Sequence, residues 1–308
     1  MSTSVNLNLD RVTGVYSGTI NGVKVRSARK QYLEYKYESI TGVKMSFDQF
    51  MGNVSKSVAP AKKTAEFNIN SRFSFVEKLV KMVAAGVQPS AVITGEGGLG
   101  KSFTVTKTLA DCGIRDVTEL ADFQVGMVLN SGKSYVTVKG YSTAKGLYRT
   151  LFENRNSIIV FDDCDSVLKD PVALNLLKGA LDSYGKRVIS WNADMRDEDL
   201  PRSFNFEGRV IFISNLNQDK IDQAIRSRSM MIDLTMTLDQ KIDRMEHIAK
   251  SADFLPEYSQ KIKQDAIDLI RKVKDEAREI SLRTLISVAK IRASNDDWKD
   301  LATYMLVA

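Results

Sequence analysis

Residues 95–102 constrain the fold of this chain more than any other feature. They match the pattern G-x-x-x-x-G-K-[ST], and the members are Gly95, Glu96, Gly97, Gly98, Leu99, Gly100, Lys101 and Ser102. The apolar run 91–94 precedes them, and residues 103–110 are compatible with a helix. Backbone N–H groups at a helix N-terminus bind phosphate, the lysine reaches the β- and γ-phosphates, and the serine holds Mg²⁺. The segment therefore predicts a phosphate-binding loop between a buried strand and a helix, rather than a Gly-rich turn that matches by chance.

Composition excludes several other classes of protein. Of the 308 residues, 43% are hydrophobic and 27% are charged, which is ordinary for a globular protein. The chain has no run of about 20 apolar residues and no secretory signal pattern, so we expect a cytoplasmic protein with no membrane partner. Two cysteines and a single histidine, His247, are too few for a disulfide framework, a zinc site or a histidine-based triad.

The positive charge is concentrated in residues 1–66. This segment has ten Lys/Arg and five Asp/Glu, an excess of five out of a net charge of +6. Asn21 and Gly22 separate two strand-like runs and predict a β-hairpin. Residues 29–37 interleave tyrosines with basic residues, which suits the stacking of nucleic-acid bases but is more typical of an edge strand or a half-buried helix. Residues 55–64 are small, polar and Pro-containing, as in a linker. The basic excess is compatible with nucleic-acid contact and equally with a solvated face.

Residues 67–235 alternate helical and strand-like segments, which predicts an α/β domain with a parallel sheet flanked by helices. The expected strands are 91–94, 134–138, 158–161, 188–191 and 210–215, and helices are expected around 75–83, 146–153 and 174–181. Residues 236–308 contain only apolar positions at helical spacing, so we expect a small all-helical C-terminal lid.

Carboxylates and an amide follow two of the expected strands. Asp162 and Asp163 come after the apolar run 158–161, and Asn215 ends the run 210–214. In an open α/β sheet the ligand lies at the carboxyl ends of the strands. We therefore expect Asp162 on the magnesium side, Asp163 orienting the attacking water, and Asn215 between that water and the γ-phosphate. The alternative is a capped turn, with Asp165 and Ser166 as helix caps.

Two arginines, Arg226 and Arg228, follow near the end of an expected short helix. A guanidinium directed at the γ-phosphate of a neighbouring subunit neutralises charge in the transition state, and such arginine fingers are worth about 10³ to 10⁵ in rate. Taken alone, the two side chains are ordinary surface charges. Their order after the loop, the acids and Asn215 favours the finger.

The chain resembles the AAA+ ATPases over roughly residues 67–292. The resemblance is carried by Walker A (95–102), Walker B (158–163), a sensor 1 residue (Asn215), residues 227–229, which look like the Ser-Arg-Cys motif of clamp loaders, and a sensor 2-like segment (280–285). It implies an AAA+ P-loop NTPase fold with domains 1–66, 67–235 and 236–308, and Arg283 as the lid arginine. It also implies ATP and Mg²⁺ at the interfaces of a homo-oligomer, usually a six-membered ring. The whole chain looks most like AAA+ proteins of tailed bacteriophages, which implies a bacterial host cytoplasm.

The same resemblance directs attention to the loop after the second strand, which faces the pore in such rings. Here the loop carries Lys139, Gly140 and Tyr141. An aromatic residue beside a glycine suits protein threading, and a lysine suits nucleic-acid phosphate. The alternative is that Tyr141 packs against its own helix. The basic segment 1–66 favours DNA slightly over protein as the macromolecular substrate.

One departure from the family pattern affects the expected activity. The second Walker B acid is usually Glu, whereas here it is Asp163, which is one methylene shorter. Because displacements near 1 Å cost about 10²-fold in rate, we expect slow but real ATP hydrolysis. Two functions stay open: a ring motor that remodels or translocates a macromolecule, and a nucleotide-switched loader or scaffold in which hydrolysis only resets assembly. A P-loop kinase is disfavoured because it needs neither a finger arginine nor a helical lid.

Overall fold

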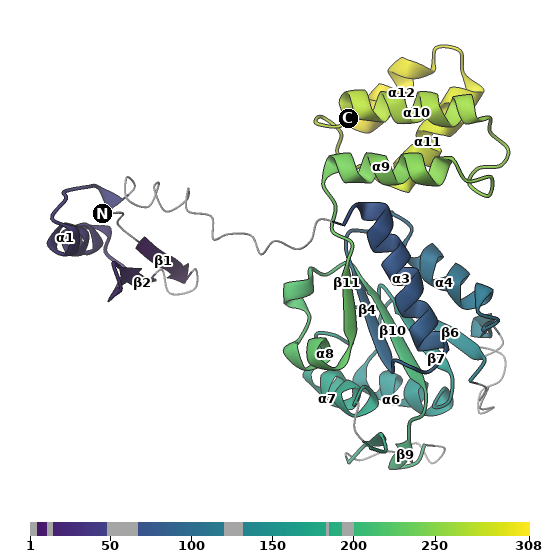
Figure 1. Ribbon diagram of the computed structural model, residues 1–308, viewed down its shortest axis with the longest axis horizontal. Coiled ribbons are helices and arrows are strands. Elements are labelled where there is room, and N and C mark those ends of the chain that lie inside the picture. The colour runs from purple at the N-terminus through teal and green to yellow at the C-terminus, as the bar shows by residue number, and fades with distance from the viewer. Residues whose placement is uncertain (1–4, 11–14, 48–66, 120–131, 183–184, 193–199) are drawn as a thin grey trace. The chain divides into compact units, whose positions relative to one another are not determined.

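The computed structural model (Figure 1) describes residues 5–10, 15–47, 67–119, 132–182, 185–192 and 200–308. By their internal contacts, the residues divide into two compact units, Met1–Glu66 and Phe67–Ala308. The linker expected at residues 55–64 lies outside the described residues. No helix within the described ranges is both long and apolar enough to span a bilayer.

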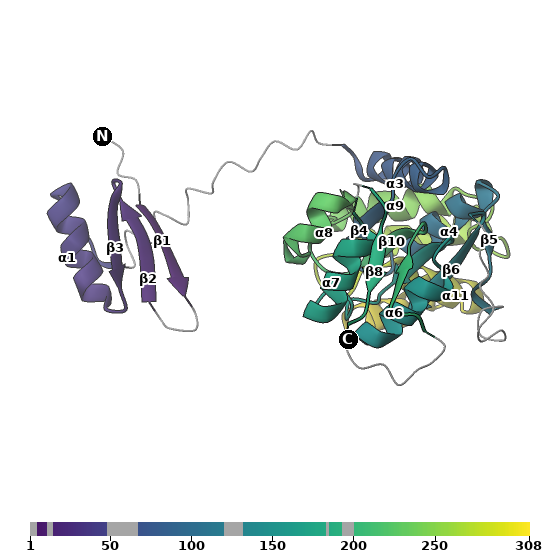
Figure 2. The ribbon, with the colours of Figure 1, turned by 90° about the horizontal axis from the view of Figure 1, so that it is seen from below.

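The first unit contains a three-stranded antiparallel sheet and one helix. Strands β1 (Val5–Asp10), β2 (Val15–Ile20) and β3 (Val23–Ser27) lie in that order, with helix α1 (Lys30–Thr41) next to β3 (Figure 2). Asn21 and Gly22 connect β2 to β3, and both have the positive φ angles that a tight hairpin turn needs. Apolar side chains from all four elements, together with one from the segment after α1, make the core: Leu7, Ile20, Val25, Leu33, Tyr37 and Phe47. Residues 29–37 therefore contribute to a helix, one of the two forms expected for them.

The second unit is built on a six-stranded sheet in which every neighbouring pair is parallel. The strand order is β11-β4-β10-β7-β6-β5. The strands are β4 (Ser90–Thr94), β5 (Arg115–Asp116), β6 (Ser134–Lys139), β7 (Ile158–Asp162), β10 (Arg209–Ser214) and β11 (Met230–Asp233). All residues of β4 and β7 are buried, as the apolar runs there require.

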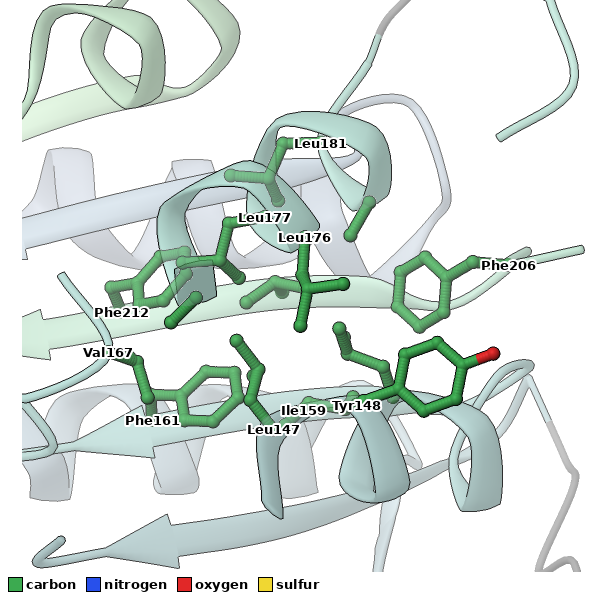
Figure 3. Close-up of a cluster of buried hydrophobic side chains, with 14 of the residues drawn as sticks. Leu147, Tyr148, Ile159, Phe161, Val167, Leu176, Leu177, Leu181, Phe206 and Phe212 are labelled. Atoms are coloured by element: carbon green, nitrogen blue, oxygen red, sulfur yellow. The ribbon is translucent and has the colours of Figure 1, made fainter. Parts of the chain in front are cut away.

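Helices cover both faces of this sheet. On one face, α3 (Ile69–Ala84) and α4 (Lys101–Asp111) bury side chains against Ile93, Val160 and Ile211. On the other face lie α6 (Ala144–Glu153), α7 (Pro171–Ala180) and α8 (Gln223–Arg228). Figure 3 shows this second core, in which Phe161 of β7 and Phe212 of β10 stack with ring centroids 5.3 Å apart. The expectation of a parallel sheet flanked by helices is met.

One expected strand does not belong to this sheet. Residues 188–191 were expected among its strands, but β8 (Val188–Ser190) pairs antiparallel with β9 (Ser203–Asn205) in a separate two-stranded ribbon. Val188 and Ser190 of β8 are exposed and only Ile189 is buried, whereas a central strand of a parallel sheet is buried on both faces. The edge strands β5 and β11 were not expected from the sequence.

The C-terminal part of the second unit is helical. It consists of α9 (Leu238–Ala249), α10 (Gln260–Val273), α11 (Leu282–Ser294) and α12 (Trp298–Val307). A short 3-10 helix, η1 (Gln218–Lys220), precedes this part and follows β10. Hydroxyl side chains of Thr237, Ser259 and Ser281 cap the first three of these helices. Arg244 of α9 lies 3.6 Å from the centre of the Phe73 ring, and its guanidinium donates to Asn70 of α3. Burial there lowers the pKa of Arg244 to about 10. These contacts fix α9 against the α/β domain.

Candidate functional site

The candidate site lies where β4, β7 and β10 end beside one another. The loop that follows β4 leads directly into α4, whose N-cap is Gly100 in the left-handed conformation at φ 93°. The register pairs Thr94 with Ser214 and Asp162 with Ile213, so the residues after these strands surround the loop. This is the edge of a parallel sheet at which open α/β folds bind their ligands.

Lys101 is buried inside the loop that it follows. Its ammonium donates to the carbonyl oxygens of Gly95 and Glu96, each at 2.7 Å, and to Oδ1 of Asn215 at 3.0 Å. An ammonium has three protons to donate, and these three acceptors use all of them. Burial lowers the pKa of Lys101, although the carboxylates of Asp163 and Asp162 act in the opposite direction.

Ser102 and Asp162 form an oxygen-rich pair at the start of α4. The Ser102 hydroxyl donates to Oδ1 of Asp162 at 2.7 Å, and Asp162 is 6% exposed. Hard oxygen donors of this kind suit Mg²⁺, which is typically held by one or two protein groups together with waters and phosphate oxygens. No cluster of three or more His, Cys, Asp or Glu side chains able to hold a metal occurs in the part of the chain that the structure describes. The Ser102 and Asp162 oxygens are of the type that would hold Mg²⁺ together with a phosphate ligand.

The other oxygen of Asp162 has a partner that the sequence did not suggest. Nζ of Lys139, the last residue of β6, lies 3.3 Å from Oδ2 of Asp162. The Lys139 side chain is 70% exposed, whereas the Asp162 side chain is 8% exposed. One of the residues assigned to the expected pore loop thus contacts the carboxylate assigned to the magnesium side.

Asp163 and Asn215 complete a chain of hydrogen bonds to Lys101. Nδ2 of Asn215 donates to Oδ1 of Asp163 at 2.8 Å, while the other end of the same amide accepts from Lys101. Asp163 has φ 56°, a left-handed conformation that aspartate tolerates better than most residues. Burial and the neighbouring Asp162 raise the pKa of Asp163, and Lys101 opposes that rise. Strained backbone and a shifted carboxyl pKa are features that concentrate at functional sites.

The helical C-terminal part closes over the loop. The backbone N–H of Leu282 donates to the Gly98 carbonyl at 2.8 Å, and Lys241 of α9 forms an ion pair with Glu96. A Cβ on Gly98, which has φ 74°, would lie 2.9 Å from Cβ of Ser281. Gly98 therefore permits a contact that no larger residue would allow without movement.

A cavity of about 300 Å³ lies between the loop and this lid. Its lining includes Lys101, Ser102, Asp163, Asn215 and Arg283. Arg283 also acts electrostatically on Asp163, whose carboxyl pKa it lowers against the effect of burial. The structure thus brings all the expected site residues of the loop, the two acids, Asn215 and the lid arginine to one place.

The two candidate finger arginines lie elsewhere. Arg228 ends α8, and its backbone carbonyl accepts from the hydroxyl of Ser90, the first residue of β4, at 3.2 Å. The phosphate loop follows the last residue of β4, so Arg228 and the loop occupy opposite ends of the same strand. Nη1 of Arg228 donates to the Ala224 carbonyl at 3.1 Å, and Nε is buried without a partner among the described residues. Arg226 is exposed.

The expected pore loop projects from the carboxyl end of β6. Gly140 has φ 83°, and Tyr141 is 80% exposed. The alternative that Tyr141 packs against its own helix is therefore wrong.

Some contacts of the site had no recognisable signal in the sequence. Lys241 of α9 pairs with Glu96 without belonging to any motif, whereas Ser281 and Leu282, which also contact the loop, lie in the sensor 2-like segment 280–285. Asp165 was considered only as a cap. Its Oδ1 accepts from the hydroxyl of Ser214 at 2.6 Å, which ties the turn after β7 to the end of β10.

No protein-family model matches the chain. It is 27% identical over 301 residues to the uncharacterized 36.7 kDa protein in the nrdC-mobD intergenic region of Enterobacteria phage T4, with 91% of this chain and 85% of the phage protein covered. A solved structure of C. elegans PCH-2 matches with 13% identity and a TM-score of 0.38, over 78% of this chain and 66% of PCH-2.

The chain is thus similar to a bacteriophage protein over most of its length. Its second unit has a six-stranded parallel sheet flanked by helices, with a phosphate-loop motif at the carboxyl end of β4, which is consistent with the fold of P-loop NTPases.

Proposed function

We propose that this protein is an AAA+ ATPase that hydrolyses ATP at the interfaces between its own copies. The observation that carries the proposal is the chain of hydrogen bonds from Lys101 through the Asn215 amide to Asp163, beside the Ser102–Asp162 pair. A phosphate-loop lysine, a metal-side carboxylate and a second carboxylate are what ATP hydrolysis requires. The cavity that they line, with Arg283 from the lid, supports a nucleoside triphosphate as the ligand.

Each side chain then has a distinct role. The loop N–H groups and Lys101 hold the β- and γ-phosphates, and Ser102 and Asp162 hold Mg²⁺, which neutralises phosphate charge when bound. Asp163 accepts a proton from the attacking water, and Asn215 fixes the orientation of that carboxylate. Arg283 adds positive charge from the lid. The raised pKa of Asp163 brings this carboxyl closer to the range in which a general base is effective.

The positions of Arg226 and Arg228 support action in trans. Ser90 and Thr94 are separated by four residue steps, or about 13 Å along the strand, so the arginines lie far from the loop of their own chain. In a head-to-tail assembly, every interface places the α8 end of one copy against the loop end of the next copy. Such an assembly forms a closed ring when the rotation between neighbouring copies divides a full turn evenly. We therefore assign the finger to Arg228, assisted by Arg226, in a ring that we expect to be hexameric.

The substrate of such a ring is a macromolecule, with DNA slightly favoured over protein. The exposed Tyr141 and the lysine beside Gly140 support movement of a polymer past this loop. Tyr141→Ala is expected to abolish work on a polymer while leaving basal ATP hydrolysis intact.

A nucleotide-switched loader or scaffold is the second candidate. The observation that favours it is Asp163, a short carboxylate held at 2.8 Å by Asn215, which slows hydrolysis if it reaches the water poorly. In that case Tyr141→Ala leaves function unchanged, and ATP binding alone drives assembly.

The test of the first proposal is a mixing experiment. Arg228→Ala and Asp163→Asn are each expected to reduce ATP turnover by about 10³-fold or more, whereas Arg226→Ala has a smaller effect. In an equal mixture, about a quarter of randomly assembled interfaces combine an intact cradle from one copy with an intact arginine from the next. Recovery of about a quarter of wild-type turnover therefore supports sites shared between copies. A mixture no more active than the average of the two variants overturns the proposal.

A further inference from the structure

The three-stranded sheet of the first unit has one covered face and one uncovered face. Leu7, Ile20 and Val25 point to the side on which α1 packs. Side chains alternate along a strand, so the residues between them point to the other side. The register pairs Ser17 with Arg26 and Thr19 with Lys24. We call these four residues the outer sheet face.

The outer sheet face is polar and positively charged. Ser17, Lys24 and Arg26 are exposed and Thr19 is half-buried. Among the side chains that the structure describes, neither Lys24 nor Arg26 has an ion-pair partner. By backbone register, β1 extends this row with Asn6 opposite Thr19 and Asn8 opposite Ser17, and its end, Asp10, pairs with Val15.

Basic residues continue past the end of β3. Residues 23–33 contain four basic residues and no acidic one, and Arg29 is exposed at the N-cap of α1. The acidic Glu34 and Glu38 belong to α1, which packs on the covered side of the sheet, and Glu34 accepts from the backbone N–H of Phe47 at 2.6 Å. Lys30 and Lys36 of α1 are balanced by these two glutamates, whereas β2 and β3 contain no acidic residue beside Lys24 and Arg26. Two copies of the outer sheet face would therefore repel each other.

We propose that the outer sheet face binds duplex DNA by entering the major groove. The four residues lie on β2 and β3 alone, and a two-stranded ribbon of this kind is what a major groove about 12 Å wide admits. Lys24, Arg26 and Arg29 neutralise phosphates on the groove walls, while the hydroxyls of Ser17 and Thr19 are donors and acceptors for base edges. The inference deepens the proposed function by naming the polymer, but binding itself needs no nucleotide.

The experiment measures binding of the full chain, without nucleotide, to a fluorescent 20-base-pair duplex at several salt concentrations. Three phosphate contacts predict a slope of about −2.7 for log affinity against log salt, or about a 40-fold loss between 50 and 200 mM. Lys24→Gln combined with Arg26→Gln is expected to reduce the slope to about −0.9 and weaken binding about 60-fold at 0.1 M salt. The matched control, Lys36→Gln combined with Lys44→Gln, removes the same charge from α1 and the segment after it, and its affinity stays within about twofold of wild type.

The outcomes separate this proposal from that of ATP hydrolysis. Thermal unfolding of both double variants checks that the fold is kept, and the Lys24/Arg26 variant is expected to hydrolyse ATP at the wild-type rate. Equal losses in the two double variants, or a preference for single-stranded DNA or RNA of the same length, would overturn the groove proposal. Loss of turnover in a Lys101→Ala variant tests only the ATPase.

Discussion

Gly98 occupies a position that the loop motif leaves unrestricted, yet its place in the structure predicts a strict requirement for glycine. Its φ of 74° is left-handed, and an added Cβ would lie 2.9 Å from Cβ of Ser281, closer than carbon atoms approach without movement. In a Gly98→Ala variant the left-handed backbone costs about 1–2 kcal/mol, and the steric conflict adds about 1–3 kcal/mol. We therefore expect destabilisation by at least about 2 kcal/mol, together with partial separation of the lid from the loop.

The neighbouring Gly97 is a matched control for this prediction. A Cβ there would meet Oδ1 of Asn215 at 3.6 Å, an ordinary contact, and its φ lies outside the left-handed region. For a domain of this size, 2 kcal/mol lowers Tm by about 4–8 °C, so differential scanning calorimetry without nucleotide distinguishes Gly98→Ala from Gly97→Ala. If the two variants melt at the same temperature, the close approach of Ser281 to the loop does not exist in solution.

Three further predictions concern charged groups of the site. Lys241→Met removes the ion pair with the half-exposed Glu96, so its effect on the free energy of unfolding is at most about 1 kcal/mol. The variant should melt slightly below the wild type at low salt, and this difference in Tm should disappear at high salt. Burial raises the pKa of Asp163 above its unfolded value, so ionisation opposes folding as pH rises through the folded pKa. Asp163→Asn should therefore raise Tm at pH 7, and this gain should shrink as the pH falls toward 4. Lys139→Met leaves Asp162 without its ion-pair partner, and titration calorimetry should detect tighter Mg²⁺-nucleotide binding, since a competing cation is gone.

The sequence predicts the local parts of the site well because they depend on local chemistry. The loop glycines, Lys101 and the apolar runs before Asp162 and Asn215 each fix a strand or turn within a few residues. Since parallel strands end at the same edge, their order then brings those residues together. The expected N-terminal hairpin follows from Asn21 and Gly22 for the same reason.

The remaining features depend on packing between distant segments. Nothing local in the sequence of β8 indicates whether it pairs with the main sheet or with β9. In the same way, the motif treats Glu96 and Gly98 as variable positions, and only the docked lid shows that one pairs with Lys241 and the other accepts from Leu282. Long-range contacts of this kind leave no periodicity in either partner.

If the loop binds nucleotide as proposed, the lid contacts couple that binding to the position of the lid. The Gly98 carbonyl accepts from Leu282 on the side facing the lid, while the loop's N–H groups are the groups expected to bind phosphate. A ligand that binds one loop conformation more tightly shifts the equilibrium between open and closed lid positions by its difference in binding free energy. By the same coupling, closure of the lid changes the affinity for the ligand. Arg283 follows Leu282 directly, so displacement of the lid moves positive charge away from Asp163. Because the same segment carries both the hydrogen bond and the arginine, closure of the lid over the loop and the approach of Arg283 to Asp163 are one structural event.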